Sequence, residues 1–197
     1  TKKRMTACIS SQVGCSLACS FCATGRLKRM RNLTYDEIYD QVVEINNLAK
    51  ENYQKPLTNI VYMGMGEPLL NYKNTLESIK KITSDEGLGM ASRRITVSTA
   101  GIAKMIIKLG DDNVKFNLAL SLHATNDEAR DKIMEINQQN SLGSLAEALK
   151  YYYDKTGNMV TYEYCLLDGV NDSLKEAHEL VQFCQHVPSK VNLIEYN

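Results

Sequence analysis

Short β-type segments alternate with amphipathic helical segments along almost the whole chain. Residues 115–122 alternate apolar and polar side chains, which is the period of a strand with one buried face. Residues 35–51 instead repeat apolar side chains at spacings of three and four, and Thr34 with Glu37 forms a capping box at their start. This alternation predicts βαβ units and a parallel sheet, because consecutive parallel strands need a long crossover between them.

The same patterns predict six strands and six helices. The strands are expected at residues 6–10, 59–63, 94–98, 115–122, 159–167 and 190–195. The helices are expected at 35–51, 72–84, 102–109, 126–135, 145–156 and 173–186, with further capping boxes at Thr125/Glu128, Ser144/Glu147 and Ser173/Glu176. Six units are fewer than the eight of a closed barrel, so the chain is expected to form either a partial (β/α)6 barrel or a doubly wound sheet. In both folds ligands bind at the carboxyl ends of the strands.

The composition is that of an ordinary globular domain. The 197 residues are 44% hydrophobic and 23% charged, and no segment approaches the roughly 20 apolar residues of a membrane span. The N-terminus carries no apolar signal-peptide core, so we expect a soluble, cytoplasmic protein with no membrane partner. The chain starts at Thr1 and stops at Asn197, directly after a predicted strand, which suggests an excerpt of a longer protein.

The N-terminal segment is strongly basic although the formal net charge of the chain is zero. Residues 1–35 carry a charge of +7 and no carboxylate. The basic residues are Lys2, Lys3, Arg4, Arg26, Lys28, Arg29 and Arg31. This asymmetry favours an anionic partner near the segment. The alternative is that part of the charge balances cysteine thiolates or forms a solvated face.

Three cysteines follow the first predicted strand as a C-x3-C-x2-C run, at Cys15, Cys19 and Cys22. Thiolates this close together need a metal to neutralise them. A structural zinc site needs a fourth ligand, which would be Cys8 or a distant histidine. Three cysteines without an obvious fourth ligand instead favour a [4Fe–4S] cluster with one iron left open for a substrate or cofactor.

This cysteine run, with Phe21 before its last cysteine, resembles that of the radical S-adenosylmethionine (SAM) superfamily. Further segments resemble RlmN-type RNA adenine methyltransferases: Cys8-Ile-Ser-Ser-Gln-Val-Gly-Cys15, Met63-Gly-Met-Gly-Glu-Pro-Leu69, Ser98-Thr99, Ser121-Leu-His123, Asp168-Gly-Val-Asn-Asp172 and Asn192-Leu-Ile-Glu-Tyr-Asn197. The resemblance covers nearly the whole chain. It implies that residues 1–197 form a radical SAM catalytic barrel, without the family's N-terminal RNA-binding domain and C-terminal methyl-carrier segment.

The resemblance also implies a reaction, a methylation of carbon 2 of adenosine in 23S rRNA and tRNA. Carbon 2 lies between two ring nitrogens and is a poor nucleophile, which explains a radical route. In the family, a radical made from SAM activates a methyl group carried on a cysteine, and a second cysteine resolves the resulting protein–RNA crosslink by forming a disulfide. The partners implied are RNA, whose target base must leave its stack, and an electron donor protein such as flavodoxin.

The family's site residues map onto this chain by position. Cys15, Cys19 and Cys22 are implied as cluster ligands, and Cys8 as the resolving cysteine. The implied SAM contacts are Gly66, Glu67, Ser98, Ser121, Leu122, His123 and Asn197. The methyl-carrying cysteine of the family would lie beyond Asn197.

Other candidate residues have structural interpretations. Cys165 lies in an apolar strand and Cys184 on an apolar helix face, so core packing is expected for both. For Cys8 the alternative role is packing in the core, and for Gly64 and Gly66 it is a bend at a strand end. Asn171 and Asp172 are expected to form a turn and a helix cap.

Three alternative functions stay open. A Cfr-type enzyme would methylate carbon 8 of adenosine, and its motifs overlap with these. Another radical enzyme, such as an activase that places a radical on a protein, fits the cysteines but not the other motifs. A zinc-stapled RNA-binding module would use the same cysteines without catalysis.

Overall fold

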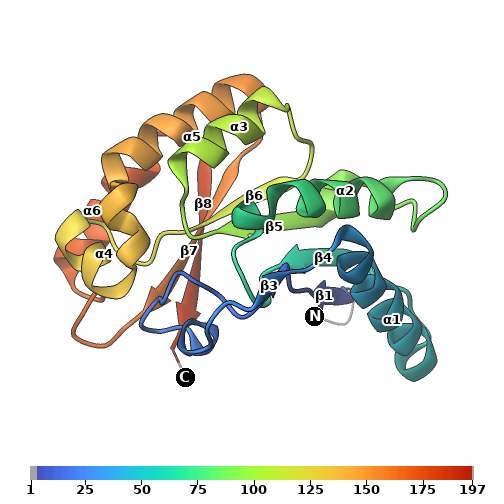
Figure 1. The fold of residues 1–197 in the computed structure, drawn as a ribbon. Helices are drawn as coiled ribbons and strands as arrows, with labels where there is room; N and C mark the ends of the chain where they lie inside the picture. The colour runs from blue at the N-terminus through green and yellow to red at the C-terminus, as the bar shows by residue number, and fades with distance from the viewer. Residues whose placement is uncertain (1–3, 197) are drawn as a thin grey trace.

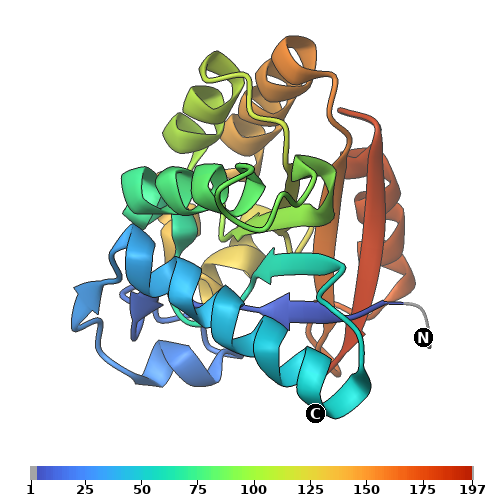
Figure 2. The ribbon, with the colours of Figure 1, turned by 90° about the vertical axis from the view of Figure 1, so that its right-hand side faces the viewer.

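Six parallel strands form one curled sheet in the computed structural model, which describes residues 4–196 (Figures 1 and 2). The strands are β1 (Thr6–Cys8), β4 (Asn59–Tyr62), β5 (Ile95–Thr99), β6 (Asn117–Ser121), β7 (Val160–Leu166) and β8 (Ser189–Glu195). Their order in the sheet is their order in the chain. A doubly wound sheet would reverse its order at a switch point, so the fold is the partial (β/α)6 barrel.

Helices cover the outer face of this sheet (Figure 1). They are α1 (Tyr35–Tyr53), α2 (Tyr72–Thr83), α3 (Ala103–Asp111), α4 (Asp127–Ile133), α5 (Leu142–Thr156) and α6 (Leu174–Cys184), with 3-10 turns at Ala23–Arg26, Pro68–Asn71, Ser92–Arg94 and Glu135–Gln139. An antiparallel ribbon of β2 (Gln12–Val13) and β3 (Arg31–Asn32) was not predicted, since two-residue strands are too short to show a period. No helix among the described residues is both long and apolar enough to cross a membrane.

Strand β5 divides its side chains between two environments. Ile95 and Val97 are fully buried among the core residues, while Thr96 and Ser98, which alternate with them, are only partly buried. Because side chains alternate along a strand, Thr96 and Ser98 point to the concave side of the half-barrel. The concave side of the half-barrel therefore carries polar side chains that are not part of the hydrophobic core.

Two helix starts differ from the predicted ones. The capping box at Thr34 is confirmed. Helix α4, however, is capped by Asn126, whose side chain accepts from Ala129 N, and the Thr125 hydroxyl donates to Glu179 instead. Helix α5 starts three residues early because Ser141 caps it. In both cases a second capping side chain lies upstream or downstream of the predicted one, and the sequence motif alone does not choose between them.

Candidate active site

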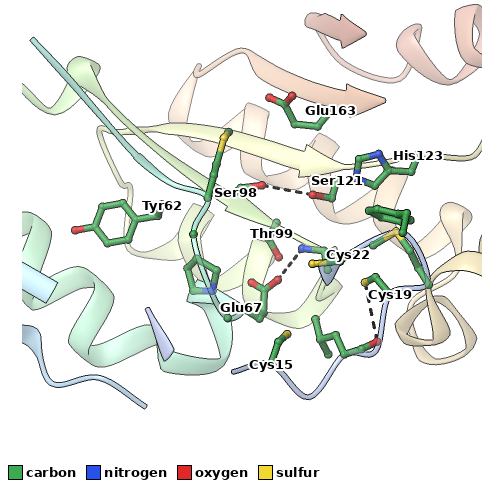
Figure 3. A pocket seen from close by; sticks show the side chains of 18 of the residues that line it. Cys15, Cys19, Cys22, Tyr62, Glu67, Ser98, Thr99, Ser121, His123 and Glu163 are labelled. Carbon is green, nitrogen blue, oxygen red and sulfur yellow. Dashed lines mark hydrogen bonds between the residues drawn. The ribbon is translucent and has the colours of Figure 1, made fainter. Parts of the chain in front are cut away.

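A cavity of about 250 Å³ lies at the carboxyl ends of the strands (Figure 3). Eight of the predicted site residues line it: Cys15, Cys19, Cys22, Gly66, Glu67, Ser98, Ser121 and His123. Two others do not, since Leu122 is fully buried in the core and Cys8 is outside the lining. The predicted contact of Asn197 lies outside the described residues.

The cysteine loop, residues 14–30, is closed at its base by the β2–β3 ribbon. Gln12 pairs with Asn32 and Val13 with Arg31, so both ends of the loop are held together. Leu17 and Phe21 line the cavity and pack against a small apolar cluster beside α4. These two side chains thus form part of an apolar wall next to the three thiols.

The three thiols are suited to a metal cluster by their chemistry. Burial raises the pKa of Cys15, and it raises that of Cys19 to about 12, although the charge of Arg130 opposes the shift at Cys19. Thiolates in such a place need positive charge, which bound iron supplies. Among residues 4–196, no three His, Cys, Asp or Glu side chains are arranged to hold a metal ion. In a cubane each cysteine binds a different iron, so its ligands need not converge on one point. The ligand assignment stays a prediction.

Glu67 is a buried carboxylate held by backbone groups. Its Oε1 accepts from Leu69 N at 2.9 Å and its Oε2 from Ala100 N at 2.7 Å. Burial raises the pKa of Glu67 to about 7, although these N–H groups lower it. Figure 3 shows the carboxylate beside the cysteines. Since each oxygen can accept a second hydrogen bond, Glu67 can still receive an ammonium group.

Close packing against Gln12 requires a glycine at position 66, and the sequence did not reveal this contact. Its φ is +95°, and a Cβ there would lie 2.5 Å from the Cβ of Gln12. Gln12 is fully buried, and its Oε1 accepts from Glu67 N at 2.9 Å while its Nε2 donates to Asn32 at 2.7 Å. Gly66 therefore allows the ribbon and the Glu67 turn to approach closely, in addition to lining the cavity.

His123 is fixed by a network centred on Asn171. Cys165 N donates to His123 Nδ1 at 2.9 Å, so the ring proton is on Nε2. The Asn171 Nδ2 donates to the carbonyls of His123 and Cys165, both at 2.7 Å, and its Oδ1 accepts from Leu167 N. Burial lowers the pKa of His123 to about 3. The turn expected at Asn171 is confirmed, but the expected helix cap is wrong, because Ser173 caps α6. The histidine is held neutral.

Arg130 was not predicted, yet it is a central support of the cavity wall. It is fully buried, and its guanidinium donates to the carbonyls of Ala100, Ser121 and Leu122 at 2.7 to 3.0 Å. A fourth bond goes to Asn137 Oδ1 at 2.8 Å. Burial lowers the pKa of Arg130 to about 10. A single arginine in a short amphipathic helix carries no sequence signal for such a role.

Strand side chains form the opposite part of the cavity. The Ser98 and Ser121 hydroxyls lie 3.5 Å apart, and Glu163 accepts from Asn192 Nδ2 at 2.7 Å (Figure 3). Glu163 was also missed. Its signal was available, since a carboxylate between Tyr162 and Tyr164 in an apolar strand has no reason to be there unless it faces a polar interior.

The remaining cysteines have different environments. Cys165 is buried in β7 and Cys184 packs partly against the main core, so packing is confirmed for both. Cys8 is exposed at the end of β1, which contradicts the alternative of a packed core residue. All six cysteines are unpaired, and a disulfide involving Cys8 stays a prediction.

Two of the basic residues in the N-terminal segment, Arg29 and Arg31, already interact with side chains of the protein. Arg31 makes a bidentate pair with Glu37, with both N···O distances at 2.7 Å. Arg29 donates to Asn32 Oδ1 at 3.2 Å. Arg26, Lys28 and Arg29 are exposed on the cysteine loop.

Comparison with known proteins agrees with this geometry. The family model for the Radical SAM superfamily matches residues 9–181. A probable dual-specificity RNA methyltransferase RlmN of Cytophaga hutchinsonii is 63% identical over 194 residues, covering 98% of this chain and 53% of that protein. A protein of the same description from Christiangramia forsetii is 58% identical over 197 residues, covering 100% of this chain and 56% of that protein.

Solved structures show the same fold. A radical SAM methyltransferase from Sphaerobacter thermophilus superposes with a TM-score of 0.95 at 44% identity, covering 98% of this chain and 57% of that one. The FeFe-hydrogenase maturase HydG from Carboxydothermus hydrogenoformans superposes at 0.69 with 19% identity, covering 99% of this chain and 46% of that one, and shares the fold alone.

The half-barrel and its cysteine loop define a radical SAM protein, a class whose members use a [4Fe–4S] cluster and SAM. Within that class, the chain belongs to the RlmN family of RNA methyltransferases. It spans about half the length of the curated relatives that it matches.

Proposed function

We propose that residues 1–197 are the catalytic barrel of a radical SAM enzyme that methylates carbon 2 of adenosine in 23S rRNA and tRNA. The observation that carries this proposal is one cavity shared by three thiols, a buried carboxylate and the strand-end hydroxyls. The names of the relatives support RNA as the substrate.

The residues of the cavity divide the task. Cys15, Cys19 and Cys22 would hold the cluster, which supplies one-electron chemistry and an open iron for the amino and carboxylate groups of SAM. Glu67 would accept a hydrogen bond from the SAM ammonium group, and the hydroxyls of Ser98 and Ser121 would bind its polar atoms. Gly66 and His123 line the same cavity. The neutral His123 carries its ring proton on Nε2 and can donate a hydrogen bond from that atom.

Apolar side chains form part of the wall around these groups. Leu17 and Phe21 cover the cysteine side, and the Phe21 ring packs edge-on against His123 with centroids 4.6 Å apart. An apolar surrounding strengthens electrostatic interactions within the cavity and protects reactive species from water. Leu122 supports this wall from the core rather than from the cavity.

Cys8 is proposed as the resolving cysteine. Its exposed position at the end of β1 lets a partner group reach the sulfur, which a packed residue would not allow. The methyl-carrying cysteine and the SAM contact of Asn197 belong to the proposal without a structural account.

RNA would bind beside the cavity through phosphate contacts of Arg26, Lys28 and Arg29. Arg31 is a weaker candidate, because Glu37 already neutralises it. We also propose a cytoplasmic location and an electron donor protein such as flavodoxin. Six unpaired cysteines are consistent with a reducing compartment.

The test is anaerobic reconstitution of the full-length protein with iron and sulfide, followed by reaction with SAM, reductant and RNA. Mass spectrometry of the digested RNA should show 2-methyladenosine. Methylation at carbon 8 would identify the Cfr-type reaction instead. Stoichiometric zinc without a cluster chromophore would identify the zinc-stapled module and overturn the enzymatic proposal.

A further inference from the structure

The concave side of the half-barrel contains a second cavity, at the opposite ends of the same strands. Its volume is about 490 Å³, almost twice that of the candidate active site. Strand β5 contributes Thr96 to this cavity and Ser98 to the active site, and β7 likewise contributes Thr161 and Glu163. The two cavities are therefore successive levels of one interior, two residues or about 6.6 Å apart along β5 and β7.

This second cavity is lined by four positively charged side chains. Arg4 precedes β1, Arg93 and Arg94 lie in the turn before β5, and Lys190 is the second residue of β8. Residues that are far apart in sequence thus meet at the amino ends of the strands, because a parallel sheet places all these ends at one edge.

The four cations lack counter-charges in the described part of the chain. No carboxylate of residues 4–196 lines the cavity, and the ion pairs of these residues involve other side chains. Like charges gathered around one cavity repel each other, so a bound anion would lower the electrostatic energy. Apart from Met159, the other residues that line this cavity are neutral and polar. Asn117 lies beside Thr96, and Lys190 lies beside Thr161, in the register of the sheet.

The side chains also indicate the class of anion. Guanidinium groups bind phosphate oxygens in a bidentate manner, and lysine binds phosphate as a point charge. Four cations match more than one phosphate group. No aromatic ring of the described residues lines the cavity, so the lining offers no stacking surface for a nucleobase. The recognition is directed at phosphate groups rather than at bases.

We propose that the amino-terminal end of the half-barrel interior is a binding site for a phosphate-bearing anion, held by Arg4, Arg93, Arg94 and Lys190. The phosphate groups could come from a free polyphosphate compound or from the backbone of an RNA. The site is separate from the cofactor cavity and does not depend on the proposed methyl transfer.

The experiment uses the full-length protein and calorimetry with inorganic tripolyphosphate as the probe, at constant ionic strength. The double variant R94Q/K190Q should bind it at least about tenfold more weakly than wild type. The matched control K80Q/K104Q removes two exposed charges outside the cavity and should change the affinity less than about twofold. The single variant Arg94→Lys keeps the charge, so it should bind tripolyphosphate more tightly than R94Q/K190Q does.

A second arm identifies the source of the phosphate. Binding of a single-stranded RNA oligonucleotide is measured with the same variants. A loss of RNA affinity in R94Q/K190Q supports the site with an RNA backbone as its ligand, whereas unchanged RNA affinity with weaker tripolyphosphate binding supports a free polyphosphate. SAM binding by the reconstituted protein should be unaffected by both double variants. Absence of tripolyphosphate binding to the full-length protein, or equal losses in both double variants, overturns the proposal.

Discussion

Two sides of the candidate active site are built in different ways. The strand-end wall consists of buried groups whose hydrogen bonds are made within the protein: Glu67 to two backbone N–H groups, Arg130 to three carbonyls, and Asn171 to three partners. The cysteine loop has little regular structure, its three thiols are only partly buried, and the 3-10 turn within it, Ala23–Arg26, contains no buried residue.

The difference shows which part of the site the protein organises by itself. The wall holds its geometry through bonds that exist without any cofactor, which is the usual means of preorganisation. The loop is fixed at its base by the β2–β3 ribbon and through Ser20 N, which donates to the Ile133 carbonyl at 3.0 Å. Its three thiols depend on a bound cluster for the positive charge that thiolates need. Loss of the cluster should therefore affect the loop, and loss of internal bonds should affect the wall.

The largest expected effect is removal of one cluster ligand. Cys19→Ala should abolish the cluster chromophore and SAM cleavage in the reconstituted full-length protein, because a cubane with two protein ligands is not held. The unfolding free energy of the cluster-free protein should change by less than about 1 kcal/mol, since the thiol is partly exposed. Iron analysis and urea unfolding measure both. Cys184→Ala, a matched loss of a thiol elsewhere, should keep full iron content; equal iron loss in both variants would contradict the assignment.

The wall should respond in the opposite way. Arg130→Met removes the guanidinium that donates to the carbonyls of Ala100, Ser121 and Leu122, and it should destabilise the cluster-free protein by about 3–5 kcal/mol. Urea denaturation gives this number. Lys132→Met, two residues away on the exposed face of α4, should cost less than about 1 kcal/mol, because its pair with Glu128 is solvent-exposed. A cost below about 1 kcal/mol for Arg130→Met would show that the wall is not supported by this residue.

Asn171 and Asp172 provide a matched pair at the edge of the wall. Asn171→Ala removes bonds to the His123 and Cys165 carbonyls and should cost about 2–3 kcal/mol. It should also weaken SAM binding, since His123 loses its support. The exposed Asp172 accepts only from Gly169 N at 3.1 Å in the described structure, and Asp172→Ala should cost less than about 1 kcal/mol. Thermal unfolding and calorimetry compare the two, and equal costs would argue against the network.

The fold could be predicted because its signals are local and repeated. Period-two apolar segments and the capping box at Thr34 are visible without knowledge of the tertiary structure, and their alternation implies a parallel sheet. The choice between barrel and doubly wound sheet needed the strand order, which depends on the direction of each crossover. Local patterns do not encode that direction.

The candidate active site likewise contains residues that could be predicted from the sequence and residues that could not. The cysteine spacing predicted the cluster loop, and the resemblance to RlmN-type enzymes implied Glu67, Ser98, Ser121 and His123 as cofactor contacts. The supports of the wall could not be found, because Arg130 and Gln12 act through backbone groups far away in sequence. Leu122 was expected among the SAM contacts, but its side chain points into the core, since it alternates with Ser121 at the end of β6.

The smallest expected effect compares both sides directly. In hydrogen exchange of the cluster-free protein, amides of the cysteine loop such as Cys22 N should exchange faster than Ala100 N in the wall, because the Ala100 bond to Glu67 is buried. Reconstitution should slow exchange in the loop by about tenfold, equivalent to about 1.4 kcal/mol of local stabilisation, and change it less than about twofold at Ala100. Cys19→Ala taken through the same reconstitution should show no slowing. If the loop amides were already as protected as Ala100 before reconstitution, the loop would be preorganised like the wall and the contrast between them would not hold.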